Sequence, residues 1–305
     1  MLTVENGVMA DHSADHITTE ESAKLIADVR AKFGRDGVQF YPGVSYRHLT
    51  IVAGEEYGKT ACTPPHDILG QPVDRYLPSG PGSEVLRRVM QESTSLLEGH
   101  PVNQQRVRQG KRPANMLWFW GQGTAVEFPP FREAYGLKAA CISAVDIVRG
   151  IGRLAEMEIL QVPGITGYFD TNYAGKAQYA LKALDDGYDF ILIHVESTDE
   201  AGHMGDANKK IQAIEDVDQR LVKDLLEGLK TRGQPFAVLV TPDHPTSVEK
   251  RTHISDPVPF AVYATGGAKD AVSSYNETAV RGSSLRFEQG FELMRYFIGT
   301  DSVIR

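Results

Sequence analysis

Residues 190–206 have the sequence FILIHVESTDEAGHMGD, and this stretch decides the fold class. Its first six residues, FILIHV, are almost continuously apolar, which is typical of a central parallel strand that is covered on both faces. The polar motif Asp199-x-x-x-His203 follows within a few residues. A buried strand that leads into a polar motif predicts an α/β protein with functional groups beyond the carboxyl end of a strand.

The flanking sequence, from about residue 136 onward, alternates short apolar runs with amphipathic helical stretches. Apolar residues at three- and four-residue spacing between Ile211 and Leu229 predict a helix that connects two strands. Together these segments predict a mainly parallel sheet with covering helices. The expected strands are 137–142, 190–195, 236–241 and 258–264, and the expected helices are 145–158, 174–184 and 211–229.

Residues 14–131 have a different pattern and predict a separate α+β domain of about 120 residues, a natural size for a compact domain. Thr18 and Glu21 form a capping box that opens a helix, and Gly34 is expected to end it. Ser83 is expected to cap a second helix. The other expected elements are a strand-like segment at 38–53, a turn-rich stretch with five prolines at 63–82, and a buried strand at 116–120.

The composition is that of an ordered globular protein. Of its 305 residues, 41% are hydrophobic and 24% are charged, which argues against disorder. The net charge of -8 disfavours a broad nucleic-acid-binding surface. No run of 18 apolar residues occurs and the first ten residues do not resemble a secretory signal, so we expect a cytoplasmic protein without a membrane partner. Cys62 and Cys141 predict neither a disulfide framework nor a zinc finger.

Three imidazoles and two carboxylates within 55 residues form the strongest functional signal. Divalent metals bind neutral imidazole and carboxylate together. The Asp-x-x-x-His spacing places two ligands about one helical turn apart, although a lone pair of this kind is more often a solvated helix face. An adjacent Asp-His pair at a strand end would point in opposite directions, which suits a two-metal site. The candidate ligands are Asp199, His203, Asp243, His244 and His253.

The blocks around these ligands resemble the metal-binding blocks of archaeal-like cofactor-independent phosphoglycerate mutases, which belong to the alkaline phosphatase superfamily. These blocks are DEAGHMGD (199–206), PDHPT (242–246) and RTHISDPVPF (251–260). The resemblance covers nearly the whole chain. It includes ENGVMADHSADHITTEE (5–21), FYPGVSYRHL (40–49), TPPHDILG (63–70), the stretch from HPVN to ANMLWFWGQG (100–123), AVDIVRGIGRLAEME (144–158) and GYFDTNYAGKA (167–177).

The resemblance implies an alkaline-phosphatase-like α/β core with a mainly parallel sheet, plus an inserted α+β cap that clamps the substrate. The implied boundaries are residues 1–13 as the leading strand of the core, 14–131 as the cap, and 132–305 as the metal-binding core. The implied activity is that of a glycolytic isomerase, which interconverts 3-phosphoglycerate and 2-phosphoglycerate through a phosphoserine.

In that family the serine and a further aspartate ligand precede the cap, so we expect both before Met1. No serine of this sequence lies in a matching motif. Because the covalent carrier would be missing, we expect these 305 residues alone to be inactive.

The resemblance distributes the five ligands over two divalent metal ions. Asp199, His203 and His253 would hold one ion, and Asp243 and His244 would hold the second. Mn²⁺ is the expected metal, with Mg²⁺, Co²⁺ and Zn²⁺ as alternatives.

Six further residues are candidates for substrate binding, and each has a structural alternative. A guanidinium binds carboxylate or phosphate bidentately, but Arg47 and His48 could equally be an exposed pair at a strand end. His66 and Asp67 lie in a proline-rich loop, where capping of a turn is the rival interpretation. The full set is Arg47, His48, His66, Asp67, Arg149 and Lys176, of which the last two could simply be solvated.

Other histidines have open interpretations. We interpret His194, inside the apolar run, as a hydrogen-bonded core histidine or as one that supports a metal ligand. Asp11, His12 and His16 form a polar cluster near the expected domain junction, where hinge contacts and substrate contacts are equally plausible.

Two alternative functions also stay open. One is a different phosphatase or phosphotransferase of the same superfamily, because the fold and the metals are shared while the cap determines the chemistry. The other is a non-catalytic protein that binds substrate and metal without the nucleophile. The sequence indicates no oligomeric state.

Overall fold

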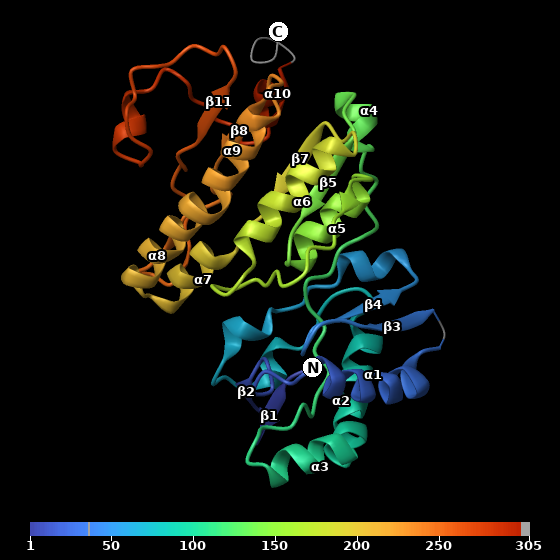
Figure 1. Ribbon diagram of the computed structural model, residues 1–305. Helices are drawn as coiled ribbons and strands as arrows, with labels where there is room; N and C mark the ends of the chain where they lie inside the picture. Colours follow the sequence, from blue (N-terminus) through green and yellow to red (C-terminus); the bar gives the residue numbers. More distant parts are fainter. Residues whose placement is uncertain (36, 300–305) are drawn as a thin grey trace. The chain divides into compact units, whose positions relative to one another are not determined.

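The computed structural model describes residues 1–35 and 37–299, which divide into two compact units, Met1–Val126 and Glu127–Arg305 (Figure 1). The first unit mixes helices with two small antiparallel hairpins. In chain order it contains β1 (Thr3–Glu5), β2 (Val8–Asp11), α1 (Thr19–Phe33), β3 (Val38–Pro42), β4 (His48–Val52), η1 (Glu55–Lys59), η2 (Pro65–Ile68), η3 (Val73–Tyr76), α2 (Ser83–Glu98) and α3 (Pro101–Arg108).

Residues 1–13, which were expected to lead into the core of the second unit, lie in the first unit instead. They form the hairpin of β1 and β2, and an isolated bridge joins Leu2 to Met116. The physical reason is burial: Leu2 and Met9 pack into one apolar cluster with Met116, so this segment satisfies its apolar surface within the first unit. The boundary between the units falls a few residues before the expected one at 131/132.

Helix α1 begins and ends where the sequence predicted. The Thr18 hydroxyl accepts the backbone N–H of Glu21 and the Glu21 carboxylate accepts the backbone N–H of Thr18, which confirms the capping box. Gly34 forms the C-cap. Helix α2 differs slightly, because Gly82 is its N-cap and Ser83 is its first helical residue. The predicted strand-like segment at 38–53 is the antiparallel pair of β3 and β4.

The predicted strand at 116–120 is wrong. Met116, Leu117 and Trp118 are buried, but apart from the bridge at Met116 they form no ladder among the described residues. The backbone N–H of Leu117 donates instead to the Ser93 hydroxyl of α2. An apolar run predicts burial, and here a side-chain acceptor on a helix replaces the strand partner.

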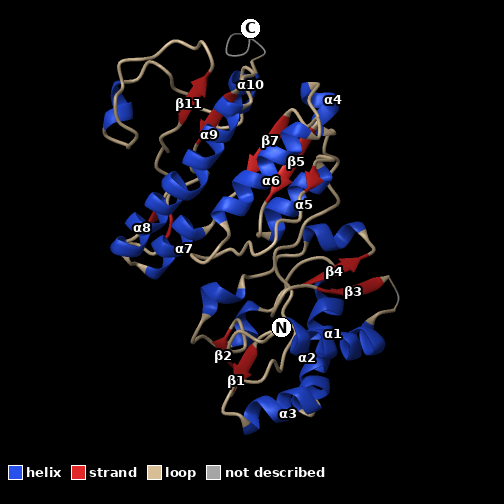
Figure 2. Ribbon diagram, in the orientation of Figure 1, coloured by secondary structure: helices blue, strands red, loops and turns tan. Residues whose placement is uncertain are grey.

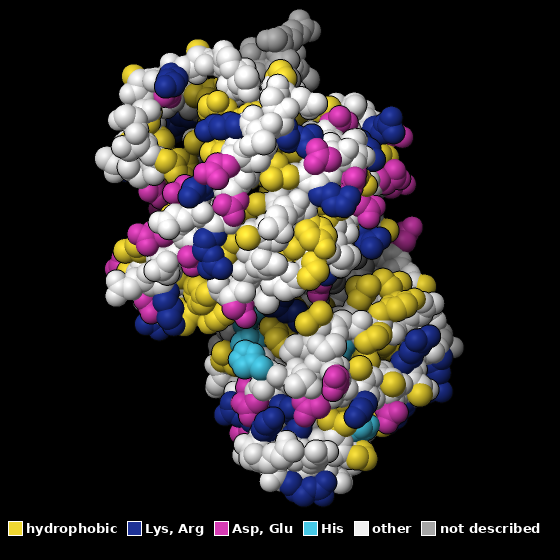
Figure 3. Space-filling view, in the orientation of Figure 1, with side chains coloured by type: hydrophobic (Ala, Val, Ile, Leu, Met, Phe, Trp, Pro, Cys, Tyr) yellow, Lys and Arg dark blue, Asp and Glu magenta, His cyan; other side chains and the backbone are white. Residues whose placement is uncertain are grey.

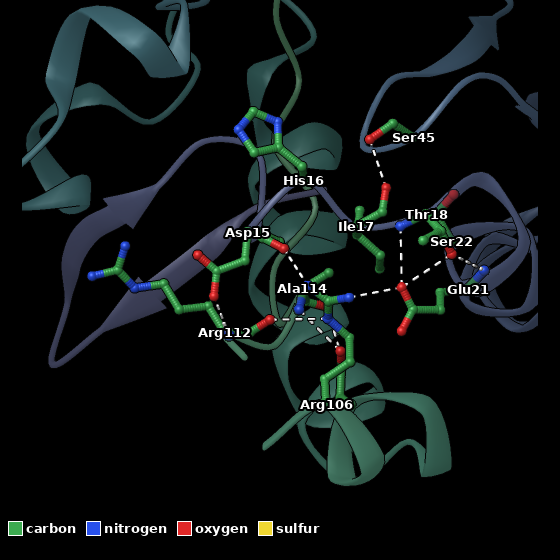
Figure 4. Close-up of polar contacts among 12 residues, drawn as sticks. Asp15, His16, Ile17, Thr18, Glu21, Ser22, Ser45, Arg106, Arg112 and Ala114 are labelled. Atoms are coloured by element: carbon green, nitrogen blue, oxygen red, sulfur yellow. Dashed lines mark hydrogen bonds and ion pairs between the residues drawn. The ribbon is translucent and has the colours of Figure 1, made fainter. Parts of the chain in front are cut away.

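A buried arginine organises the centre of the first unit (Figure 4). Arg106 is 1% exposed, and its guanidinium forms a 2.7 Å ion pair with the carboxylate of Glu21. It also donates to the backbone carbonyls of Ala14 and Arg112. Because a guanidinium can only donate, these carbonyls and the carboxylate satisfy it in a water-poor site. Residues 106–112 contain four basic side chains, and such a run usually indicates a solvated face, but for Arg106 that interpretation is wrong.

The second unit alternates strands and helices (Figure 2). In chain order it contains α4 (Phe131–Tyr135), β5 (Ala139–Ile142), α5 (Asp146–Leu154), β6 (Glu158–Ile159), α6 (Tyr173–Asp185), β7 (Phe190–Ile193), α7 (Ser197–Met204), α8 (Ala207–Val217), the π-helical η4 (Asp218–Val222), α9 (Lys223–Thr231), β8 (Ala237–Val240), β9 (Thr246–Ser247), β10 (Thr252–His253), β11 (Ala261–Ala264), η5 (Ala279–Gly282) and α10 (Glu292–Ile298).

A three-stranded parallel sheet in the order β6-β5-β7 carries the fold, which confirms the predicted α/β class. The middle strand is β5, which is buried along its whole length. The expectation that residues 190–195 form a central strand covered on both faces is wrong, because β7 lies at the edge of the described sheet and exposes Leu192. Strand β8 differs from the expectation, because among the described residues it pairs antiparallel with β11 and not with the parallel sheet. The predicted helix at 145–158 ends at Leu154, and β6 follows it.

Apolar side chains also lie on the surface of the second unit (Figure 3). On α5, Ile147 is 70% exposed, and Ile151 and Leu154 are exposed on the same face of the helix.

Among the described helices, none combines the length and the apolar character that a membrane crossing would need.

Candidate metal centre

Helix α7 presents two of the candidate ligands. Asp199 lies in its first turn and His203 in its last turn, four residues later on the same face. His203 Nε2 is 3.2 Å from Asp199 Oδ2. Gly205, in the left-handed region at φ 70°, ends the helix directly after this pair.

The third ligand comes from a short antiparallel hairpin. His253 lies on β10 and pairs with Thr246 of β9. Its Nε2 atom is 3.2 Å from Asp199 Oδ1 and 3.1 Å from His203 Nε2. One ligand atom from each of Asp199, His203 and His253 therefore lies within 4.8 Å of the other two. Residues more than 45 positions apart in the sequence converge here.

These separations fit a single divalent cation. Ligands at about 2.0–2.2 Å from one ion, at angles between 90° and 110°, are about 2.8–3.6 Å apart. The tautomer of His203 also fits, because its Nδ1 is 3.0 Å from the carbonyl oxygen of Arg251. A carbonyl only accepts, so Nδ1 carries the proton and Nε2 offers a lone pair. Carboxylate and imidazole together are the donor set that first-row divalent metals bind.

Asp243 and His244 lie beside this group. His244 Nε2 is 3.3 Å from Asp243 Oδ2, and the His244 ring lies against the His253 ring, tilted by 35°, with centroids 3.8 Å apart. Neither residue belongs to a three-ligand group within the described part of the chain. The structure thus brings all five candidate ligands to one place, with three of them converging on a common point.

A second polar group, formed by Ser143, His194 and Glu196, lies next to the first turn of α7. The His194 imidazole bridges the Ser143 hydroxyl, 3.2 Å from Nδ1, and the Glu196 carboxylate, 3.3 Å from Nε2. Burial raises the pKa of Glu196, and the nearby carboxylate of Asp199 raises it further. Burial lowers the pKa of His194. His194 therefore has a polar partner beside each ring nitrogen and connects the ends of β5 and β7 to the helix that carries Asp199.

Of the two candidate substrate residues in this unit, Lys176 is the more constrained. It is 1% exposed, and its ammonium group donates to the carbonyl of His194 at 2.7 Å. Burial lowers the pKa of Lys176 to about 8. The ammonium thus holds the end of β7 and is not presented to solvent. Arg149 is half-buried on α5, where it lies 3.4 Å from the Gln161 side chain.

Two candidates of the first unit follow the turn between β3 and β4. The Arg47 guanidinium lies over the Tyr46 ring at 5.2 Å and donates to its hydroxyl at 3.0 Å. His48 Nδ1 accepts the backbone N–H of Gly43 at 3.2 Å, whereas its buried Nε2 has no hydrogen-bond partner among the described residues. Burial, with the nearby N-terminal charge, lowers the pKa of His48 to about 3. Arg47 is exposed, and His48 is a neutral, half-buried base.

His66 and Asp67, on η2, complete the candidates. His66 Nε2 lies 3.7 Å from Asp67 Oδ1. The His66 ring has edge contacts with Trp120, at 5.5 Å, and with His12, at 6.2 Å. His12 also contacts the Tyr46 ring, and its buried Nδ1 has no hydrogen-bond partner in the described part of the chain. The sequence had grouped His12 with Asp11 and His16, but it did not indicate that His12 adjoins His66.

Fold and ligands together define a metal-binding α/β enzyme. The family model of the Metalloenzyme superfamily matches residues 43–287, and the chain covers about three quarters of the length of its similar curated relatives. The 2,3-bisphosphoglycerate-independent phosphoglycerate mutase of Methanosarcina acetivorans is 47% identical over 296 residues, which are 96% of this chain and 74% of the relative. The chain belongs to the family of 2,3-bisphosphoglycerate-independent phosphoglycerate mutases.

Further relatives agree in both sequence and fold. A probable 2,3-bisphosphoglycerate-independent phosphoglycerate mutase of Geobacter sulfurreducens is 44% identical, over 95% of this chain and 72% of the relative. The solved cofactor-independent phosphoglycerate mutase of Thermoplasma acidophilum superposes with a TM-score of 0.56 at 27% identity, over 93% of this chain and 71% of that one. A solved protein of Pyrococcus horikoshii superposes with a TM-score of 0.69 at 26% identity, over 92% of this chain and 66% of that one.

Proposed function

We propose that this chain supplies the metal centre and the substrate-binding residues of an enzyme that interconverts 3-phosphoglycerate and 2-phosphoglycerate. The convergence of Asp199, His203 and His253, in a chain that is 47% identical to a phosphoglycerate mutase, carries this proposal. These three residues would hold one divalent cation, and Asp243 and His244 would hold a second. Mn²⁺ is the proposed ion, with Mg²⁺, Co²⁺ and Zn²⁺ as alternatives.

Divalent cations at such a site lower the pKa of a nucleophile and stabilise charge on phosphoryl oxygens. The chain's own residues prepare the site for this. Asp199 contributes a negative charge, and His203 is held in the tautomer that keeps a lone pair on Nε2. The resemblance implies a serine as the phosphoryl acceptor, and for the groups described here we propose roles in binding and orienting the substrate.

We assign the first unit to binding the anionic groups of the substrate. Arg47 supports this, because its exposed guanidinium matches a carboxylate or phosphate bidentately. His66 and Asp67 would line the same subsite, since His66 reaches the Tyr46–Arg47 turn through His12. His48 would shape the turn through its bond to Gly43, and Arg149 would contact substrate from α5. For Lys176 we propose a supporting role through the carbonyl of His194.

The experiment follows phosphorus-31 resonances during incubation with 3-phosphoglycerate and Mn²⁺, without 2,3-bisphosphoglycerate. One sample contains these 305 residues alone, and a second also contains the N-terminal segment of the Methanosarcina acetivorans relative, fused or added. We expect 2-phosphoglycerate in the second sample only, and EDTA should abolish its formation. The Arg47→Gln variant should raise KM about 10- to 100-fold at unchanged metal content, because a charged hydrogen bond is worth about 1.5–3 kcal/mol.

Arg88→Gln is the matched control, since Arg88 is an exposed arginine on α2, and it should leave KM unchanged. Release of inorganic phosphate instead of 2-phosphoglycerate would identify a phosphatase and overturn the mutase proposal. Turnover by the 305 residues alone would show that the acceptor lies within them.

A further inference from the structure

Thr246, the last residue of the PDHPT block, contacts more of the candidate centre than its short side chain suggests. It is 5% exposed. Its hydroxyl donates to Asp199 Oδ1 and lies 3.4 Å from His244 Nδ1. Its backbone pairs with that of His253 in the β9–β10 ladder. One residue is thus in contact with a member of each proposed ligand group.

The direction of these hydrogen bonds follows from the number of protons. An ionised carboxylate only accepts, so the single hydroxyl proton of Thr246 points to Asp199. Toward His244 the same oxygen can therefore only accept, and His244 Nδ1 must carry the proton. His244 Nε2 then keeps its lone pair on the side of Asp243, whose Oδ2 is 3.3 Å away. The chain of donors runs from His244 through Thr246 to Asp199.

Two helices, α7 and α8, restrict the backbone of Thr246 on strand β9. Lys210 of α8 donates its ammonium to the Thr246 carbonyl at 2.5 Å. On α7, a Cβ atom at Gly202 would lie 2.6 Å from that carbonyl oxygen and 2.7 Å from the threonine methyl carbon. Only glycine allows this approach, because real Cβ contacts are essentially never shorter than 3.0 Å. Thr246 therefore has little freedom to move relative to Asp199.

We propose that Thr246 is a positioning residue that couples the two ligand groups of the metal centre, fixing the tautomer of His244 and the orientation of the Asp199 carboxylate. This inference rests on the proposed function, since it requires that Asp199 and His244 bind metal. Residues that hydrogen-bond to metal ligands typically change metal affinity 10- to 100-fold when they are replaced.

The test compares Thr246→Val, which keeps the shape and loses the hydroxyl, with Thr246→Ser, which keeps the hydroxyl. Co²⁺ is the probe, because its visible absorption reports coordination geometry while titration gives affinity. We expect Thr246→Val to bind Co²⁺ about 10- to 100-fold more weakly, with an altered absorption spectrum. Thr246→Ser should remain within a few-fold of the unsubstituted chain. Unchanged affinity and spectrum in Thr246→Val would overturn the proposal.

A second measurement needs no metal and no variant at Thr246. Long-range proton–nitrogen NMR spectra of metal-free protein at pH 8 distinguish the two neutral tautomers, and His244→Gln assigns the signal. We expect His244 to be protonated at Nδ1, and an Nε2-protonated ring would overturn the inference. If the chain bound no Co²⁺ at all, the proposed metal centre would fail, whereas the tautomer would still decide whether Thr246 directs His244.

Discussion

Replacing Asp199 with asparagine should abolish most of the thermal stabilisation that a divalent cation gives to the second unit. Asp199 is the only carboxylate in the three-ligand group, and each of its oxygens faces one imidazole at 3.2 Å. An amide keeps the shape but loses the negative charge that a cation requires. Two imidazoles alone would remain as ligands.

The size of the effect follows from mass action. A ligand at 100 times its Kd stabilises the folded state by about 2.7 kcal/mol. For a unit of this length, about 1 kcal/mol raises Tm by roughly 2–4 °C, so a saturating cation should raise Tm by about 5–11 °C. If Asp199→Asn weakens binding about 100-fold, the same concentration gives only about 0.4 kcal/mol, or roughly 1–2 °C.

The assay is a melting curve with and without Mn²⁺, and the quantity compared is the metal-induced change in Tm. This difference separates metal binding from any effect of the substitution on the metal-free protein. Glu227→Gln is the matched control, because it removes one exposed carboxylate from α9 of the same unit. The Glu227→Gln variant should keep the full metal-induced increase in Tm. A full increase in Asp199→Asn would refute the assignment of Asp199 as a ligand.

Two predictions concern the first unit. Glu21→Ala removes the partner of the buried Arg106 guanidinium and should lower the free energy of unfolding by about 3 kcal/mol, measured with urea, while the exposed Glu20→Ala in the same turn should change it little. Burial lowers the pKa of His48 to about 3, so the unfolded chain binds a proton that the folded one rejects. The contribution of neutral His48 to the free energy of unfolding is complete above about pH 6.5. It decreases as pH falls toward 3, by about 2 kcal/mol between pH 7 and pH 5. His48→Asn should remove this part of the pH dependence and exposed His16→Asn should retain it; equal slopes would contradict the role of His48.

Local signals in the sequence were sufficient for much of the fold. The capping box at Thr18 and Glu21 predicts the start of α1 because its hydrogen bonds involve residues three apart. The run FILIHV predicts that β7 is a strand, but the expected central place is wrong, because β7 lies at the edge of the described β6-β5-β7 sheet and is only half-buried. Pairing partners were harder to predict. The run at 236–241 predicts a strand, but nothing local specifies that β8 pairs antiparallel with β11.

The convergence of Asp199, His203 and His253 was predictable from their residue types and from their places at predicted strand ends and loops. Lys176 was not predictable in the same way. Lysine is usually exposed, so the sequence suggested an anion-binding or solvated group, whereas the structure buries its ammonium against the carbonyl of His194. That contact depends on where β7 ends relative to α6, which is a property of the packed sheet and helix.

Thr246 shows why hydrogen-bonding partners of ligands escape a search by residue type. A threonine at the end of a short motif is compatible with a turn, a strand or a cap, and its hydroxyl has no preference for metals. Its position becomes informative only when the β9–β10 hairpin brings it against Gly202 and Asp199. Gly202 is the local sequence feature that reflects this arrangement. A glycine inside a helix lowers helix stability, so its presence indicates that another segment approaches closely. A glycine inside a helix that carries candidate ligands, such as Gly202 in α7, therefore indicates from sequence alone which side of the helix a neighbouring segment approaches.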